Sequence, residues 1–156
     1  MPSTWNDIKN MTRILGIDFG ERRIGLALSD PLGIIAQPFL TFDTQKDGDI
    51  FKKIDELIEE KNIEKIILGM PKNMDGSIGE KGEVVLEFSQ KLFSRVKIPI
   101  IFRDERLSSV ESLRVLRDAG AKLHKYKKSV DKLSAALILQ GYLDSLKRKE
   151  NEESES

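Results

Sequence analysis

The sequence contains no cysteine and only one histidine, and these shortages exclude several kinds of chemistry. Without cysteine there are no disulfides, no thiolate zinc ligands and no cysteine nucleophile. A triad built on His124 lacks the G-x-S-x-G motif that would support it. No stretch approaches the roughly 20 apolar residues that span a bilayer, and residues 1–12 do not resemble a signal peptide. We therefore expect a cytoplasmic protein without a membrane partner.

Charge of one sign is not in excess either, because 26 lysines and arginines balance 26 aspartates and glutamates. Net charge therefore neither indicates nor excludes a nucleic-acid partner, and only the local distribution is informative. Between residues 103 and 128, eight basic side chains stand against four acidic ones. Such an excess would neutralise phosphates and give an affinity that falls with added salt.

The length and composition predict one domain, since 156 residues with a 39% hydrophobic share suit a single core. We expect this domain to span residues 13–146, after an extension at residues 1–12. The last ten residues, KRKENEESES, are charged and lack apolar periodicity. They predict a disordered tail over residues 147–156.

Apolar periodicity predicts three strands followed by alternating helices and strands. The expected strands cover residues 13–18, 23–29, 37–42, 65–71 and 98–106, and the expected helices cover residues 49–62, 85–96, 107–120 and 131–146. The order βββαβαβαα predicts an α/β fold. Its five-stranded mixed sheet has three antiparallel strands first and helices on both faces.

Carboxylates stand at the ends of two predicted strands and at the start of the last helix. Asp18 ends an apolar strand, Asp104 and Glu105 end another, and Asp131 lies on the core-facing stripe of the helix. Because strand side chains alternate, Asp104 and Glu105 cannot both face one site, and the pattern does not choose between them. Singly, each has an ordinary explanation as a turn residue, a solvated strand end or a helix cap.

Together, these carboxylates would concentrate negative charge, which favours a divalent cation with oxygen ligands. Mg²⁺ and Mn²⁺ both suit such ligands. Two ions roughly 4 Å apart can activate a water and stabilise the leaving oxygen of a phosphodiester, without a cysteine or histidine nucleophile. The composition therefore favours metal-dependent phosphodiester hydrolysis.

Four blocks of the chain resemble the YqgF family, also called RuvX, and they follow each other in the order and at the spacing of that family. It is a family of RNase H-like proteins related to RuvC Holliday junction resolvases. The blocks are GIDFGERRIGLALSD, GMPKNMDGSIGEKG, DERLSSVES and VDKLSAALILQGYL. The resemblance implies an RNase H-like fold and a cytoplasmic nuclease that processes the 5′ end of pre-16S rRNA in ribosome biogenesis. Its partners would be precursor 16S rRNA and ribosomal particles. The implied catalytic and metal-binding residues are Asp18, Glu105 and Asp131, with two ions bound beside the substrate.

Polar and basic residues around this presumed site are expected to bind nucleic acid. They are Arg22, Arg23, Lys72, Asn73, Arg103, Arg106, Lys125, Lys127 and Lys128. The loop that holds Lys72 and Asn73 can equally be a flexible connector. Related nucleases carry a fourth acidic ligand, for which Asp30, Asp104 and Glu80 are candidates, and no spacing chooses among them.

Three alternatives remain beside the rRNA nuclease. The first alternative is a nuclease that cleaves branched DNA junctions, which would require a homodimer. The sequence does not report symmetry and allows either a monomer or a homodimer. The second is a non-catalytic nucleic-acid-binding or ribosome-associated module. The third is an actin-like ATPase or sugar kinase, which also begins with D-x-G. That class needs two domains and a second phosphate-binding hairpin, and this chain has room for one domain.

Overall fold

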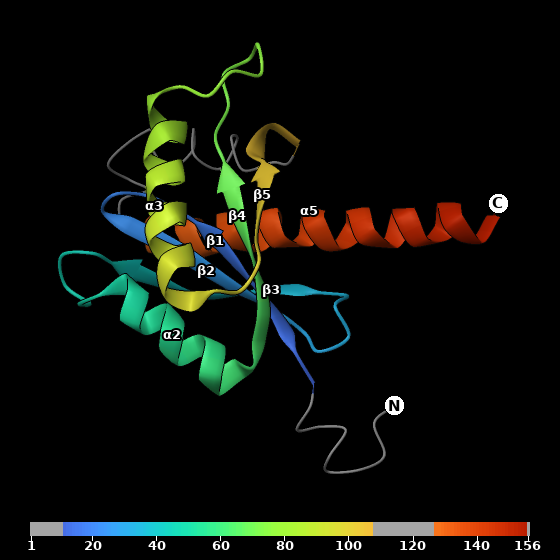
Figure 1. Ribbon diagram of the computed structural model, residues 1–156, viewed down its shortest axis with the longest axis horizontal. Helices are drawn as coiled ribbons and strands as arrows, with labels where there is room; N and C mark the ends of the chain where they lie inside the picture. Colours follow the sequence, from blue (N-terminus) through green and yellow to red (C-terminus); the bar gives the residue numbers. More distant parts are fainter. Residues whose placement is uncertain (1–10, 108–126, 156) are drawn as a thin grey trace.

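The computed structural model describes residues 11–107 and 127–155, with side chains for residues 11–106 and 130–154. Most of the predicted elements lie in these ranges (Figure 1). In chain order they are β1 (Arg13–Asp18), β2 (Arg23–Ser29), β3 (Ala36–Asp43), α2 (Ile50–Lys61), β4 (Ile63–Met70), α3 (Glu80–Val96), β5 (Ile100–Asp104), the 3₁₀ turn η1 (Glu105–Leu107) and α5 (Lys127–Glu155). The helix predicted over residues 107–120 falls almost entirely outside the described residues.

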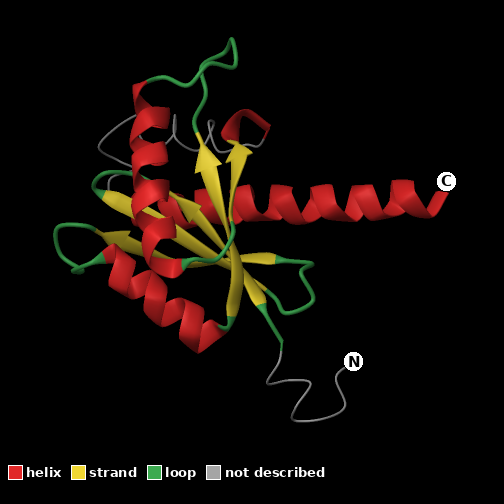
Figure 2. Ribbon diagram, in the orientation of Figure 1, coloured by secondary structure: helices red, strands yellow, loops and turns green. Residues whose placement is uncertain are grey.

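The sheet has the order β3-β2-β1-β4-β5, with β1 at its centre. The pairs β1–β2 and β2–β3 are antiparallel, whereas β1–β4 and β4–β5 are parallel. Figure 2 shows the helices in front of and behind these strands. The predicted mixed sheet with helices on both faces is confirmed.

Successive side chains of β1 point to opposite faces of the sheet and pack in two separate cores. Leu15 and Ile17 are fully buried in the core that α2 and α3 cover. Ile14 belongs to the core under α5, where Ala135 and Leu139 are also fully buried. This two-sided burial explains why β1 and β4 are almost continuously apolar.

Helix α2 shows how local sequence signals set the boundaries of an element. The Asp49 side chain accepts a hydrogen bond from the Phe51 N–H at 2.9 Å and caps the first turn. Ile54 and Leu57 lie on the buried face. The helix ends at Asn62, whose φ of 54° is left-handed, a conformation that asparagine tolerates. The element begins and ends where the sequence predicts.

Helix α5 lies unusually close to the sheet because glycines face it. A Cβ added at Gly25 of β2 would lie 1.9 Å from the carbonyl oxygen of Asp131. One added at Gly16 of β1 would lie 2.8 Å from Cβ of Leu139. Real Cβ atoms do not approach backbone or other Cβ atoms so closely, so any larger residue would push the helix outward. These glycines therefore determine where the side chains of α5 meet the strands.

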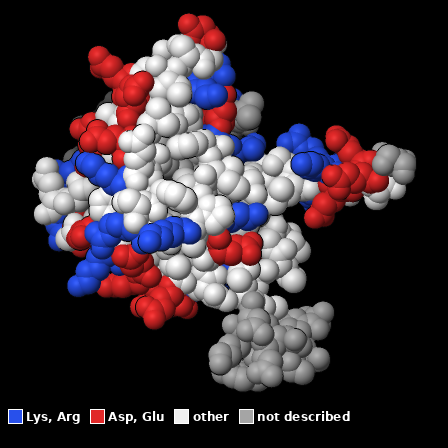
Figure 3. Space-filling view, viewed as in Figure 1, with Lys and Arg blue, Asp and Glu red and all other residues white. Residues whose placement is uncertain are grey.

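The end of α5 differs from the sequence prediction. Residues 147–155 were expected to be disordered, but the helix continues to Glu155. Lys, Arg and Glu are good helix formers, and extending an anchored helix avoids a new nucleation step. Figure 3 shows this projecting segment with basic residues first and acidic residues beyond them. None of the helices that the structure describes is long and apolar enough to cross a membrane.

Candidate functional site

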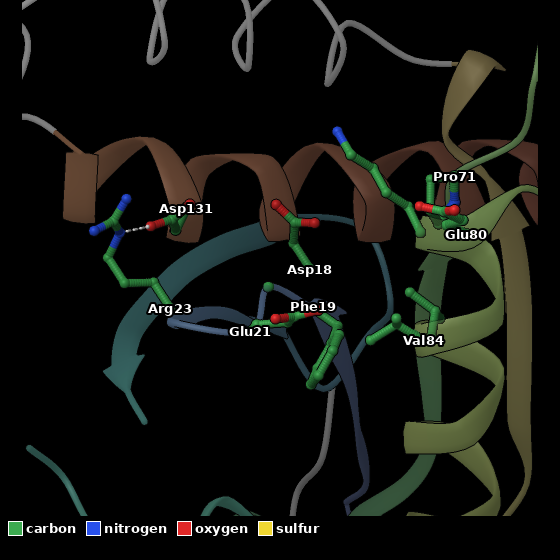
Figure 4. A pocket seen from close by; sticks show the side chains of 11 residues that line it. Asp18, Phe19, Glu21, Arg23, Pro71, Glu80, Val84 and Asp131 are labelled. Atoms are coloured by element: carbon green, nitrogen blue, oxygen red, sulfur yellow. Dashed lines mark hydrogen bonds and ion pairs between the residues drawn. The ribbon is translucent and has the colours of Figure 1, made fainter. Parts of the chain in front are cut away.

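A cavity of about 370 Å³ opens where β1 ends. Its walls come from the turn after β1, the start of β2, the loop before α3, the first turns of α3 and the start of α5 (Figure 4). The lining residues are Asp18, Phe19, Gly20, Glu21, Arg23, Pro71, Glu80, Lys81, Val84, Val85 and Asp131. Segments from both ends of the sequence therefore meet at one hollow.

Two of the three predicted carboxylates line this cavity. Asp18 is the last residue of β1 and is 3% exposed, and Asp131 on α5 is 2% exposed. Helix α5 begins four residues before Asp131, so the interpretation of Asp131 as the helix cap is wrong. Its carboxylate instead forms an ion pair with Arg23 of β2, with Nε and Oδ2 2.9 Å apart.

The third predicted carboxylate, Glu105, is also buried, at 6% exposure, but it is not part of the cavity wall. It follows β5 directly and opens η1. Its side chain lies over Gly69 of β4, where an added Cβ would come within 2.7 Å of Oε1. The neighbouring Asp104 turns to Arg106, with Oδ2 and Nη2 2.7 Å apart. The hydrogen bond from Arg106 is the main reason why the pKa of Asp104 is lowered.

The three predicted carboxylates occupy one level of the sheet, on the face that α5 covers. Asp18 pairs with Gly25 of β2 on one side, and the pairing of Ile17 with Leu68 places Gly69 of β4 on the other. The backbone of Asp131 contacts Gly25, and the side chain of Glu105 contacts Gly69. Glycine on each flanking strand therefore makes room for a segment that brings a carboxylate from a distant part of the chain.

The residues around the cavity suit a hard divalent cation. Asp18 and Asp131 offer carboxylate oxygens, and Mg²⁺ binds proteins through one or two carboxylates together with waters and phosphate oxygens. Among the described residues, no group of three or more histidine, cysteine, aspartate or glutamate side chains is arranged to hold a metal ion. The donor chemistry thus fits magnesium or manganese through the two cavity carboxylates, whereas Glu105 lies one strand away.

The candidates for a fourth acidic ligand lie in different places. Glu80, at the start of α3, lines the cavity with Asp18. Asp30 follows β2 at the opposite end of the sheet. Burial alone would raise its pKa, but hydrogen bonds from the N–H groups of Ile35, Ile34 and Leu32 outweigh burial and lower it. Of the three candidates, Glu80 is the one that lines the cavity.

The structure also adds Glu21 and Lys81 to the cavity wall, and the sequence analysis did not single them out for a site. Glu21 lies in the turn between β1 and β2, three residues after Asp18. Its place in a short connection beside a candidate carboxylate was a usable signal. Lys81 gave no such signal, because its position depends on how α3 packs over the sheet.

The two adjacent arginines expected to bind nucleic acid have different partners. Arg23 lines the cavity, whereas Arg22 pairs with Asp43 at the end of β3, with Nε and Oδ1 3.1 Å apart. Burial alone would raise the pKa of Asp43, but the N–H of Gln45 and the guanidinium of Arg22 lower it. Only Arg23 of this pair is therefore placed at the candidate site.

Hydrogen bonds close the loop before α3 into a turn. The Asn73 N–H donates to the Ser77 carbonyl at 2.9 Å, and the Asn73 side-chain amide donates to Ser77 Oγ at 3.0 Å. Arg106 donates to the carbonyl oxygens of Asn73 and Met74, each at 3.1 Å. Asn73 and Arg106 thus hold the loop in shape, and Lys72 remains exposed beside it.

The other basic residues expected to bind nucleic acid do not line the cavity. Arg103 packs against α5 at Gly141, where burial lowers the pKa of its guanidinium. Lys125 lies outside the described residues, and so do the side chains of Lys127 and Lys128. Their roles stay predictions.

Solved structures of junction-resolving enzymes share this fold. One is RuvC of T. thermophilus in complex with a Holliday junction substrate, with a TM-score of 0.52 and 13% identity over 86% of this chain and 96% of that one. Another is the Fowlpox virus resolvase in complex with Holliday junction DNA, with a TM-score of 0.53 and 14% identity over 86% of this chain and 99% of that one. The fold is therefore that of the RuvC-like, RNase H-like class.

Sequence comparison narrows this class to one family. Residues 12–145 match the profile of "RuvX: Holliday junction resolvase". A protein of Acetivibrio thermocellus named "Putative pre-16S rRNA nuclease" is 47% identical over 85% of this chain and 96% of its own length. A protein of Clostridium novyi with the same name is 46% identical over 86% of this chain and 99% of its own length. The chain belongs to the RuvX family, as the four sequence blocks predicted.

Proposed function

We propose that this protein is a metal-dependent nuclease that processes the 5′ end of precursor 16S rRNA. The names of its relatives supply the substrate. The observation that carries the chemistry is the pair of buried carboxylates, Asp18 and Asp131, on one cavity wall. Carboxylate oxygens are the ligands that Mg²⁺ and Mn²⁺ prefer, and a phosphodiester bound in the cavity would complete the coordination of such an ion.

Asp18 and Asp131 would hold Mg²⁺ or Mn²⁺, with Glu105 as the third ligand that the family resemblance assigns. When bound, the metal would supply an activated water and charge stabilisation at the leaving oxygen. The protein's own part is to keep the two carboxylates fixed, since each belongs to a regular element packed in the core. Lys81 and Arg23, the basic residues of the cavity wall, would bind the phosphate oxygens of the RNA.

The function is tested by incubating the purified protein with a 5′-extended 16S precursor RNA, in Mg²⁺, Mn²⁺ or EDTA. We expect metal-dependent trimming that Asp18→Asn reduces at least about 100-fold, the order seen when one group that stabilises charge in the transition state is removed. Asp55→Asn makes the same chemical change on the exposed side of α2 and is the matched control. Equal rates for wild type and Asp18→Asn would refute the proposed site.

Junction resolution is the second candidate, because the matching family carries the description Holliday junction resolvase. A DNA four-way junction in the same assay separates the two functions. Junction cleavage without RNA trimming would replace the rRNA nuclease with a resolvase, and sedimentation should then show a dimer. If neither substrate is cleaved but nucleic acid still binds in a salt-sensitive way, the protein would be a non-catalytic module.

A further inference from the structure

The ion pair between Arg23 and Asp131 joins a cation to a candidate metal ligand inside the cavity. Asp131 is almost completely buried, whereas the Arg23 side chain is 25% exposed. The contact uses Nε of the guanidinium, and Figure 4 shows the pair beside Asp18. In the part of the chain that the structure describes, the terminal nitrogens of Arg23 make no hydrogen bond.

The charge on Arg23 opposes a metal ion at the same carboxylate. The guanidinium of Arg23 places a positive charge beside Asp131, with Nε and Oδ2 2.9 Å apart. A divalent cation that binds this carboxylate is repelled by the guanidinium and has to displace its hydrogen bond. Arg23 and a divalent cation are competitors for Asp131.

A phosphate group is a good alternative partner for Arg23. Guanidinium groups bind phosphate through two parallel N–H groups, and such paired contacts are stronger than single ones. Arg23 lines the cavity in which the substrate would bind, and its partial exposure leaves the side chain room to turn. A nucleic-acid backbone in the cavity would thus compete with Asp131 for Arg23.

We infer that Arg23 controls metal binding: it pairs with Asp131 in the free protein and transfers to a nucleic-acid phosphate when substrate binds. This inference rests on the proposed nuclease function and adds a regulatory step to it. Metal and nucleic acid then bind cooperatively, because each favours the state in which Asp131 and Arg23 are apart. The free protein would hold its metal weakly, which limits cleavage to the bound substrate.

A purely structural role for Arg23 predicts the opposite result. If Arg23 only orients Asp131, its removal leaves the carboxylate less well placed and weakens metal binding. If Arg23 competes with the metal, its removal strengthens metal binding. The sign of one affinity change therefore separates the two roles, and the measurement needs no cleavage.

The experiment measures Mn²⁺ binding to the full chain by the electron paramagnetic resonance signal of the free ion. Wild type is compared with Arg23→Gln and with Arg22→Gln. The second variant removes the same charge from the adjacent residue, whose partner Asp43 lies outside the cavity. Each protein is titrated alone and then with a short phosphorothioate RNA oligonucleotide, which keeps its backbone charge and resists cleavage.

We expect Arg23→Gln to bind Mn²⁺ about tenfold more tightly than wild type when RNA is absent. Arg22→Gln should match wild type. The oligonucleotide should tighten Mn²⁺ binding by wild type and change Arg23→Gln much less. Circular dichroism checks the fold, and Arg23→Met, which keeps the aliphatic stem, replaces the glutamine variant if that one does not fold.

Equal or weaker Mn²⁺ binding by Arg23→Gln, in a wild type that does bind Mn²⁺, would overturn the role of Arg23 and leave the proposed nuclease intact. An equal gain in Arg22→Gln would also overturn it, because the effect would then be general electrostatics. Absence of Mn²⁺ binding in every protein, with and without RNA, would overturn both this inference and the metal-dependent function.

Discussion

The two faces of the sheet are built in different ways. The face under α2 and α3 is filled with large side chains, and Phe88 stacks on Phe19 and Phe51 with ring centroids 4.3 and 5.6 Å apart. The face under α5 combines isoleucine and leucine with alanines and with glycines that let the helix approach, and it carries the three candidate carboxylates. The first face contributes most of the apolar burial, and the second places polar groups accurately. On the α2 and α3 face, stability depends mainly on the volume of the buried side chains. On the α5 face, the site depends mainly on the distance between the helix and the strands.

Removing volume should damage the first face most. Leu57 is 1% exposed in the core beneath α2, and Leu57→Ala should lower the free energy of unfolding by about 3 kcal/mol through lost burial and a cavity. Urea unfolding measures the loss. At temperatures where the variant stays folded, its nuclease activity should match wild type, since Leu57 is not among the residues that line the cavity. A large loss of activity in the folded variant would contradict the separation of the two faces.

Adding volume should damage the second face. In Gly25→Ala the new methyl group meets the carbonyl of Asp131, so α5 must shift. We expect a loss of about 2 kcal/mol in the free energy of unfolding, typical of overpacking, and a loss of activity in the folded protein because Asp131 moves. Urea unfolding and the RNA-trimming assay give the two values. Wild-type activity in Gly25→Ala would show that the distance between α5 and β2 does not matter to the site.

A smaller effect is expected at the far edge of the α5 face, where Asp30 orders the connection between β2 and β3. Hydrogen bonds from three backbone N–H groups hold its pKa below the usual 3.8 despite the opposing effect of burial. A carboxyl whose pKa is lowered on folding stabilises the protein above the unfolded value, and this contribution is lost as the pH falls through the folded value. Asp30→Ala should therefore lower the free energy of unfolding by about 1 kcal/mol at neutral pH.

The pH dependence of Asp30→Ala supplies its own control. Urea unfolding of wild type and variant should give free energies that converge as the pH falls from above 3.8 through the lowered pKa of the folded state, because the wild-type carboxyl then becomes protonated. Cleavage at neutral pH should be unchanged, since Asp30 lies at the end of the sheet opposite Asp18. A stability difference that persists at low pH would mean that the ionised carboxylate is not its source.

The elements of this fold were predictable because each has a local signal. The apolar runs of β1 and β4 and the helical spacing of Ile54 and Leu57 in α2 depend on neighbouring residues alone. The choice between Asp104 and Glu105 was not predictable from the pattern, because β5 ends between them and η1 changes the direction of the side chains. The resemblance to the RuvX family made that choice.

The partners of the arginines were also beyond sequence reasoning. Arg22 and Arg23 are adjacent and chemically identical, so no local signal assigns one to Asp43 and the other to Asp131. The end of α5 was mispredicted for another reason. Charged residues without apolar periodicity are typical of disorder, but they continue a helix readily when the preceding turns are anchored by packing.

The ion pair between Arg23 and Asp131 joins residues 108 positions apart in the chain. During synthesis the first strands leave the ribosome long before the last helix exists, because translation adds about 5–20 residues per second. The two walls of the cavity therefore cannot meet until the segment that holds Asp131 has emerged. A nascent or truncated chain that ends before Asp131 has no complete site, so the proposed cleavage of RNA has to wait until the start of α5 is made and folded.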